Sequence, residues 1–358
     1  MNSIRIANCS GYYGDRLIAA REMVEGGPID VLTGDWLAEL TMLILAKDQA
    51  KDPNGGYART FVKQVEQVLE TCLKKNIKIV ANAGGLNPAG CAAAVQKVAD
   101  KLGLKPRIAC IEGDNLMPRM ADLKAAGHEF RNMDTGQALG ERQVLTANAY
   151  IGGWGIVEAL NRGADIVIAG RTTDAAVVAA PAAWWYGWSR DNYDAIAGAI
   201  VAGHVIECGA QATGGNYCFF QEVPGLEYPG YPIAEIAADG SSVITKHDRH
   251  GGLVSVGTVT AQLLYEIGSP AYLNPDAVAR FDTMKVEQIA PNRVQISGVR
   301  GEPPPKTLKV SMNYVGGTRT VTSMAITGLD IEQKAELYQK GLWRLFPKGK
   351  DSFSGVKT

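Results

Sequence analysis

The stretch Ala164-Asp165-Ile166-Val167-Ile168-Ala169, followed at once by Gly170-Arg171-Thr172-Thr173-Asp174, decides the fold class. Its first part is a short apolar run rich in β-branched residues, which is typical of a strand buried on both faces. Its second part is a polar turn that contains glycine, and a helical pattern over Asp174–Trp185 begins where the turn ends. We therefore expect a strand, a turn and a helix in that order.

The same unit recurs along the first two thirds of the chain. The expected strands are Ile4–Asn8, Ile29–Leu32, Ile77–Asn82, Arg107–Ile111 and Ala164–Ala169. Helical periodicity covers Asp15–Val24, Trp36–Lys47, Tyr57–Lys75, Pro88–Leu102, Leu116–Ala126, Tyr150–Asn161 and Asp174–Trp185. Such alternation predicts an α/β fold, in which a mostly parallel sheet is flanked by helices in a Rossmann-like, doubly wound arrangement.

From about Gly215 the pattern changes to Gly-Tyr-Pro turns and alternating segments, which favour antiparallel strands. Expected strands are Val243–Lys246, Arg293–Ser297 and Leu308–Asn313, and expected helices are Val259–Ile267 and Ile331–Leu345. The sequence thus predicts an α/β domain over residues 1–215 with a Gly-rich crevice, a C-terminal α+β lobe over 216–347, and a polar tail over 348–358.

Charge and cysteine usage exclude several classes of protein. The 358 residues include 36 basic and 37 acidic side chains, so no overall positive field draws the chain to nucleic acid or to an anionic membrane. No apolar run reaches the length of a spanning helix, and no leader is visible at Met1. The six cysteines are scattered, as in a reduced protein. We expect a cytoplasmic location.

The turns after the parallel strands meet at one edge of the sheet, where open α/β folds bind ligands. Their backbone N–H groups and arginines suit a small anionic substrate. The expected anion-binding residues are Gly11, Gly14, Asp15, Arg16, Asn82, Gly84, Gly85, Asn87, Asp114 and Arg171, with Gly214, Gly215 and Asn216 from a later turn. For each aspartate the alternative is ordinary helix capping, and for each arginine it is an ion pair with a neighbouring aspartate.

Two familiar nucleotide-binding motifs are missing. Gly85 and Gly90 have the spacing of a phosphate loop, but Cys91 follows where that loop carries lysine. The first turn also lacks the glycine fingerprint of dinucleotide-binding proteins, which makes an NAD-dependent dehydrogenase a weak alternative. We expect no certain cofactor, although the coenzyme A moiety of a substrate remains a candidate ligand.

Acid–base chemistry is expected from His204 and Glu207, which are three residues apart and share a face if they lie on a helix. Asp35 and Asp174, at two of the strand ends, complete the candidate catalytic set. Cys208 is either a nucleophile or a small buried residue. We expect no metal site, because His247 and His250 have no further ligands nearby and fit a solvated turn.

The segment Trp184-Trp185-Tyr186-Gly187-Trp188 is the densest group of aromatic residues in the chain. Aromatic side chains often anchor interfaces, so packing between lobes or between subunits is the first interpretation and a substrate platform is the second. A homo-oligomer is expected on this basis.

Longer motifs are spread in order along nearly the whole chain. They are Ser10–Arg16, Leu32–Glu39, Asn82–Pro88, Gly163–Ala176, Ala202–Asn216, Gly230–Glu235, Gly251–Val256 and Ser297–Pro305. In these motifs the chain resembles the acyclic terpene utilisation AtuA family. The resemblance implies a role near the breakdown of branched, isoprenoid acyl-CoA compounds such as those of the citronellol and geraniol routes, but it implies no settled reaction and no agreed catalytic residues.

Some members of that family carry an additional small ferredoxin-like domain at the C-terminus, which we expect to be absent here because the chain stops at Thr358. The absence of that domain is compatible with three situations: a separately encoded small subunit, a shortened chain, or a member that works alone.

Two classes of function remain. The first is an enzyme, most plausibly a hydratase or lyase for a small carboxylate or acyl-CoA; the second is a non-catalytic subunit that binds acyl-CoA or a nucleotide.

Overall fold

The computed structural model describes residues 3–357, and its centre is a mixed sheet. Within this range the sheet has nine strands in the order β11-β12-β8-β7-β1-β2-β3-β6-β4. The parallel strands are β1 (Ile4–Asn8), β2 (Val31–Gly34), β3 (Lys78–Ala81), β4 (Ile108–Ile111) and β6 (Ile166–Ala169). The antiparallel strands are β7 (Pro232–Ile236), β8 (Ser242–Lys246), β11 (Lys285–Ala290) and β12 (Arg293–Ser297).

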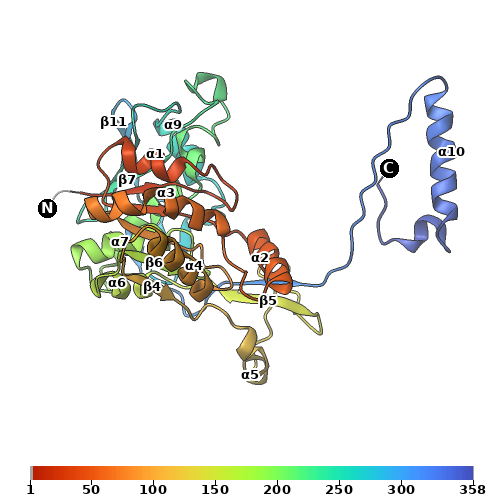
Figure 1. Cartoon of the computed structure of the whole chain (residues 1–358), viewed down its shortest axis with the longest axis horizontal. Helices are drawn as coiled ribbons and strands as arrows, with labels where there is room; N and C mark the ends of the chain where they lie inside the picture. Colours follow the sequence, from red (N-terminus) through yellow and green to blue (C-terminus); the bar gives the residue numbers. More distant parts are fainter. Residues whose placement is uncertain (1–2, 358) are drawn as a thin grey trace. The chain divides into compact units, whose positions relative to one another are not determined.

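Helices cover both faces of this sheet (Figure 1). The helices α1 (Ala19–Gly26), α3 (Arg59–Lys75) and α4 (Pro88–Lys101) share one core with Leu32 and Ile79. On the other face, α6 (Trp154–Asn161), α7 (Ala176–Tyr186) and α8 (Tyr193–Ile206) share a second core with Val31 and Val80. Successive strand residues point to opposite faces, which is why nearly every position of these strands is apolar. The expected α/β class is confirmed, and its Rossmann-like winding stays a prediction.

The antiparallel strands do not form a lobe of their own. β7 pairs directly with β1, for example at Ile6 and Ala234, and β8, β12 and β11 follow it within the same sheet. Helix α8 packs on β7 and β8 as well as on α7, so the second half of the chain shares the core of the first. One compact unit ends at Val315 and a second begins at Gly316. The structure therefore differs from the division expected at residue 215.

Smaller elements surround the sheet. They are α2 (Glu39–Lys51), α5 (Met120–Ala125), α9 (Val256–Leu263), the pair β5 (Val144–Ala149) and β14 (Val310–Tyr314), and the short strands β9 (Ala271–Leu273), β10 (Val278–Arg280) and β13 (Arg300–Glu302). Single 3-10 turns lie at Met117–Arg119, Gly209–Thr213 and Phe220–Glu222. The sequence did not predict α8, because its residues are apolar on every side and leave no periodicity to detect.

The second unit begins at Gly316 and contains α10 (Ile331–Arg344), as the sequence predicted, and a 3-10 turn at Gly349–Ser352. Three aromatic side chains contact one another in this unit: the rings of Phe346 and Phe353 meet edge to face at 4.7 Å, and the ring of Trp343 lies near both. The polar tail expected at 348–358 thus contributes an aromatic side chain to this unit.

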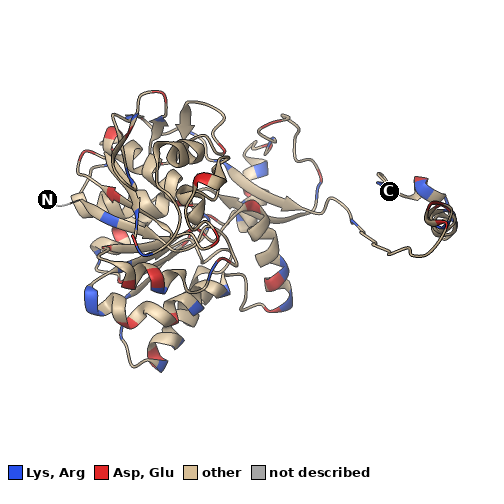
Figure 2. Cartoon of the chain, turned by 90° about the horizontal axis from the view of Figure 1, so that it is seen from above, with Lys and Arg blue, Asp and Glu red and all other residues tan. Residues whose placement is uncertain are grey.

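The distribution of charge fits the sequence analysis. Basic and acidic residues are interspersed along the helices (Figure 2). Among the residues that the structure describes, no helix is both long enough and apolar enough to cross a membrane.

The aromatic segment at the end of α7 packs mainly within the chain. Trp188 is buried and donates its indole N–H to the backbone oxygen of Ala238 at 3.0 Å, and the Tyr186 hydroxyl donates to the oxygen of Ile236. Trp185 is the most exposed of the group, at 38%. Trp188 and Tyr186 thus contact residues 236 and 238, which the sequence placed in the second lobe, in agreement with the first interpretation of packing between the two parts of the chain; the homo-oligomer stays a prediction.

Candidate active site

A cavity of about 1180 Å³ opens at the carboxyl ends of the parallel strands. Its walls include Gly11 and Asp15 from the turn after β1, Asp35 from the turn after β2, and Asp174 from the turn after β6. His204 and Glu207, at the end of α8, line the same cavity. The four residues expected to be catalytic therefore lie together, at the sheet edge where the sequence predicted a crevice.

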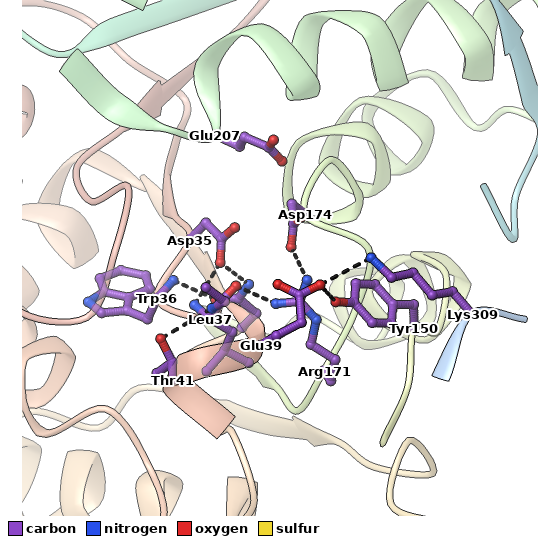
Figure 3. A network of polar contacts seen from close by, with 12 residues as sticks. Asp35, Trp36, Leu37, Glu39, Thr41, Tyr150, Arg171, Asp174, Glu207 and Lys309 are labelled. Atoms are coloured by element: carbon purple, nitrogen blue, oxygen red, sulfur yellow. Dashed lines mark hydrogen bonds and ion pairs between the residues drawn. The ribbon is translucent and has the colours of Figure 1, made fainter. Parts of the chain in front are cut away.

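Carboxylates gather at the floor of this cavity. Oxygen atoms of Asp35, Asp174 and Glu207 lie within 4.8 Å of one another, and we call these residues the carboxylate cluster. Asp35 follows β2 directly, and its Oδ1 accepts hydrogen bonds from the Leu37 N–H at 2.8 Å and from Asn82 Nδ2 at 2.5 Å. These bonds fix Asp35 in place (Figure 3). Asn82, from the turn after β3, is thus a positioning residue, since it lies outside the residues that line the cavity.

Arg171 is the basic partner of the cluster. Its Nη2 lies 2.6 Å from Asp174 Oδ1, its Nη1 donates to the backbone oxygen of Leu37, and its guanidinium stacks 4.1 Å from the centre of the Tyr150 ring (Figure 3). The side chain is almost completely buried. Because Asp174 and the Leu37 oxygen take Nη2 and Nη1, while Nε is buried without a partner, the structure favours the ion-pair alternative over a clamp for a bound anion.

Glu207 and His204 face each other from consecutive turns at the end of α8. Glu207 Oε1 lies 3.5 Å from His204 Nδ1, and both side chains are buried. His204 Nε2 is 3.0 Å from the backbone oxygen of Gln262, which can only accept, so Nε2 carries a proton. In the neutral ring Nδ1 is then a proton acceptor aimed at Glu207. The expected shared helical face is confirmed, and the geometry suits one proton held between the two side chains.

Burial and mutual repulsion shift the acid–base properties of the cluster. Burial raises the pKa of Asp35 and of Glu207 well above their usual ranges, and the nearby Asp174 carboxylate raises both further. Burial lowers the pKa of His204, which favours its neutral form. Raised carboxyl pKa values beside an imidazole of lowered pKa are an arrangement suited to general acid–base chemistry.

A second polar group, formed by Glu39, Tyr150 and Lys309, lies on the same wall of the cavity (Figure 3). Tyr150 donates its hydroxyl hydrogen to Glu39 Oε1, and Lys309 Nζ lies 3.1 Å from the same oxygen. Burial acts to raise the pKa of Glu39, but these hydrogen bonds outweigh it and lower the pKa to about 2. These three residues are not among the site residues predicted from the sequence, although Glu39 is the last residue of the motif Leu32–Glu39.

The predicted anion-binding residues in the turn after β1 are held by contacts within the protein. Arg16 lies 2.9 Å from Glu22, donates to the Pro229 oxygen and stacks on the rings of Tyr228 and Tyr231. Asp15 accepts from the Gly11 N–H at 2.9 Å and from the Tyr231 hydroxyl at 2.5 Å. Gly14 has a φ of 105°, which the turn requires. Arg16 is therefore ion-paired, but with Glu22 rather than with the neighbouring aspartate that the alternative named.

The turns after β3 and β4 lie outside the residues that line the cavity. Asn87 caps α4 by accepting from the Gly90 N–H at 2.9 Å, and buried Asp114 accepts from the Arg171 N–H and from Asn148. The Gly84 N–H donates to the oxygen of Ala169, and the Gly85 N–H to that of Asn82. Capping and turn formation, rather than ligand binding, explain these residues.

The later Gly-rich turn reaches the cavity only at Gly215. The N–H groups of Gly214 and Gly215 donate to Gln211 and Ala210, so neither amide is free for a ligand. Asn216 donates to the side chain of Gln262, 3.3 Å away. This turn therefore supports the segment that binds His204, because the backbone oxygen of Gln262 is the partner of that imidazole.

Cysteine and histidine chemistry outside the cluster is disfavoured. Burial raises the pKa of the Cys208 thiol, and the adjacent Glu207 and Asp35 carboxylates raise it further, so the nucleophilic thiolate is disfavoured. His247 is buried with its Nε2 3.0 Å from the oxygen of Met23, so it does not lie in a solvated turn as expected.

Among the residues described, the carboxylate cluster is the group whose spacing suits a metal ion, which the sequence did not predict.

The fold and the cavity define an α/β protein with a buried, acidic site at the ends of its parallel strands. The chain belongs to the acyclic terpene utilisation family, because the family model described as "Acyclic terpene utilisation family protein AtuA" matches residues 4–358. Searches of curated proteins and of solved structures found no match.

Proposed function

We propose that the chain is an enzyme of the hydratase or lyase type, which adds water to or removes it from a branched, isoprenoid acyl thioester or a small carboxylic acid. The observation that carries this proposal is the meeting of Asp35, Asp174, Glu207 and His204 at the floor of one cavity. Acid and base groups within reach of one ligand are what this chemistry needs.

The reaction would proceed by proton transfer at two neighbouring carbon atoms. In the eliminating direction, a base takes the proton from the carbon next to the carbonyl group, and the C–O bond at the next carbon breaks. The departing hydroxide takes a proton from an acid and leaves as water, while the electrons of the broken C–H bond form the new double bond. The cluster supplies several proton-transfer groups, and His204 Nδ1 can exchange a proton with Glu207 across 3.5 Å.

The walls of the cavity suit a branched hydrocarbon chain. Leu37, Ile267, Leu273, Pro275 and Leu308 lie around the polar floor. An apolar wall with a few convergent polar groups is the usual character of a small-molecule site. The coenzyme A moiety of a thioester substrate would extend toward the open side of the cavity.

The second candidate function is a non-catalytic subunit, and one observation favours it. Within the unit that begins at Gly316, Leu337 of α10 is 71% exposed, and Leu345, which follows this helix, is 77% exposed. Apolar side chains of this kind suit contact with another chain, either a second copy or a separately encoded small subunit. In that case the acidic cavity would bind a ligand without turning it over.

The test is deuterium incorporation into candidate substrates. The purified chain is incubated in D₂O with branched 3-hydroxyacyl-CoA thioesters and small 3-hydroxy acids, and mass spectrometry measures exchange at the carbon next to the carbonyl. We expect exchange with at least one substrate and a loss of at least 100-fold in Glu207→Gln. Absence of exchange across the whole panel, with activity recovered only when a partner chain is added, would favour the non-catalytic subunit.

A further inference from the structure

Glu207 carries a buried oxygen that has no partner. Its Oε2 makes no hydrogen bond with any described residue, and the side chain is 2% exposed. The carboxylate points toward Asp35 and Asp174 across the cavity floor (Figure 3). A buried carboxylate oxygen without a donor costs free energy, so this orientation indicates that something else binds there.

The charges of the site are also unbalanced. The cluster holds three carboxylates, and Arg171 is the basic residue of the described chain that contacts it, through Asp174. Lys309, the other basic residue described on the cavity wall, is paired with Glu39 instead. Glu266 on the same wall adds a further acidic group. When all three carboxyl groups are ionised, as ligands of a metal ion are, the cluster with Arg171 has a surplus of two negative charges.

We propose that Asp35, Asp174 and Glu207 bind one divalent cation of the oxygen-preferring kind, such as Mg²⁺ or Mn²⁺. A cation of charge two balances the surplus and gives Glu207 Oε2 a partner. The spacing is close to what is needed, because oxygen ligands on opposite sides of Mg²⁺ lie about 4 Å apart, and the cluster oxygens lie within 4.8 Å of one another, so a shift of less than about 1 Å brings them to the ion. Carboxylates without thiolate or imidazole ligands select hard cations of this class.

The cation also resolves a conflict in the proposed function, on which this inference rests. The cavity wall is acidic, and the terminal nitrogens Nη1 and Nη2 of Arg171 are already paired with the Leu37 oxygen and with Asp174, so neither is left to bind the oxygen of a carboxylate or thioester substrate. A bound cation with coordination positions open to the cavity would accept the substrate's oxygen. It would also lower the pKa of a bound water, which then serves as a proton-transfer group while the cluster acts as ligands.

The test is direct binding of Mn²⁺ to the full chain after removal of metals with EDTA. Free Mn²⁺ gives a six-line electron paramagnetic resonance signal that is lost on binding, so a titration measures stoichiometry and Kd. We expect one site per chain, at least tenfold weaker binding in Glu207→Gln, and competition by Mg²⁺. Glu266→Gln is the matched control, since it removes an exposed acidic group from the same cavity, and its Kd should change less than threefold.

Thermal melting checks that the variant is folded. Because Glu207 Oε2 has no partner in the described chain, Glu207→Gln should melt no lower than the wild type in EDTA, and it should lose the increase in Tm that Mn²⁺ gives the wild type. Absence of Mn²⁺ binding at millimolar concentration, or equal binding by Glu207→Gln, would overturn the inference. If the EDTA-treated chain still exchanges deuterium, the proposed function stands without the cation; if Mn²⁺ binds and no substrate reacts, the cation site stands and the proposed function fails.

Discussion

At the scale of single residues, the site depends on which charged groups are already paired. Arg16 and Arg171 look alike in sequence as arginines of strand-end turns, and both are occupied by neighbours, one by Glu22 and the other by Asp174. Glu207 differs, since its Oε2 has no partner in the described chain. Residue type and position could predict that Asp35, Asp174, His204 and Glu207 belong to the site. They could not predict which of the charges remain unbalanced, because that depends on contacts between distant segments.

Glu39 gives a pH prediction at this scale. Its folded pKa of about 2 lies below the ordinary value of 4.5, so the folded state favours the carboxylate form. The resulting stability is present above about pH 4.5 and is lost as the pH falls toward 2. The Glu39 side chain is 56% exposed, so solvent screening limits the effect to about 1 kcal/mol.

The measurement is urea unfolding of the wild type and of Glu39→Gln between pH 2 and pH 7. Glu39→Gln should be less stable by about 1 kcal/mol at pH 7 and equal to the wild type near pH 2. A difference that stays constant across this range would show that the stability does not come from the ionised Glu39. Lys340, which pairs with Glu336 on the surface of α10, offers a control: Glu336→Gln should change stability by less than 0.5 kcal/mol at any pH, as is usual for exposed pairs.

At the scale of elements, the cavity depends on a close approach between the turn after β1 and the end of α8. A Cβ placed on Gly11 would lie 2.6 Å from the backbone carbon of Cys208, next to Glu207. Gly11→Ala therefore forces the two segments apart. We expect a loss of about 1–3 kcal/mol in unfolding free energy and at least tenfold lower substrate turnover.

The control is Gly268→Ala, because no atom lies within 4 Å of a Cβ at that position. Its stability should stay within about 0.5 kcal/mol of the wild type. If Gly11→Ala behaves like this control, the contact between the turn and α8 does not hold the site together.

Most parallel strands and their helices could be predicted because each carries its own local signal. β1 begins and ends as the sequence indicated, and β6 lies within its predicted range. α8 and β5 were missed for physical reasons. α8 is apolar on all sides, since it is buried between α7 and the antiparallel strands, and β5 pairs along its length with β14, far away in sequence. Pairing between distant segments also placed β7 beside β1, which local patterns do not show.

At the scale of the whole molecule, the chain divides at Val315 rather than at residue 215. The core clusters, the sheet and the cavity all belong to the unit that ends at Val315. A chain ending at Val315 should therefore fold, with a Tm within about 3 °C of the full chain, and it should bind Mn²⁺ with the same Kd. Differential scanning calorimetry and the Mn²⁺ titration measure both; loss of cooperative melting in the shorter chain would show that the second unit is needed for the first to fold.

If the acidic cavity is the active site of a hydratase or lyase, the chain adds water to a bound unsaturated substrate, and hydration in ¹⁸O-labelled water measures this step. The chain is supplied with Mg²⁺ and branched unsaturated acyl-CoA thioesters in H₂¹⁸O, and mass spectrometry reads the label in the product. We expect one ¹⁸O atom in the hydroxy product of the wild type and a loss of at least 100-fold in the rate of labelling in Glu207→Gln. Labelling that is equal in the wild type and in Glu207→Gln, or absent with every thioester and carboxylic acid, would contradict it.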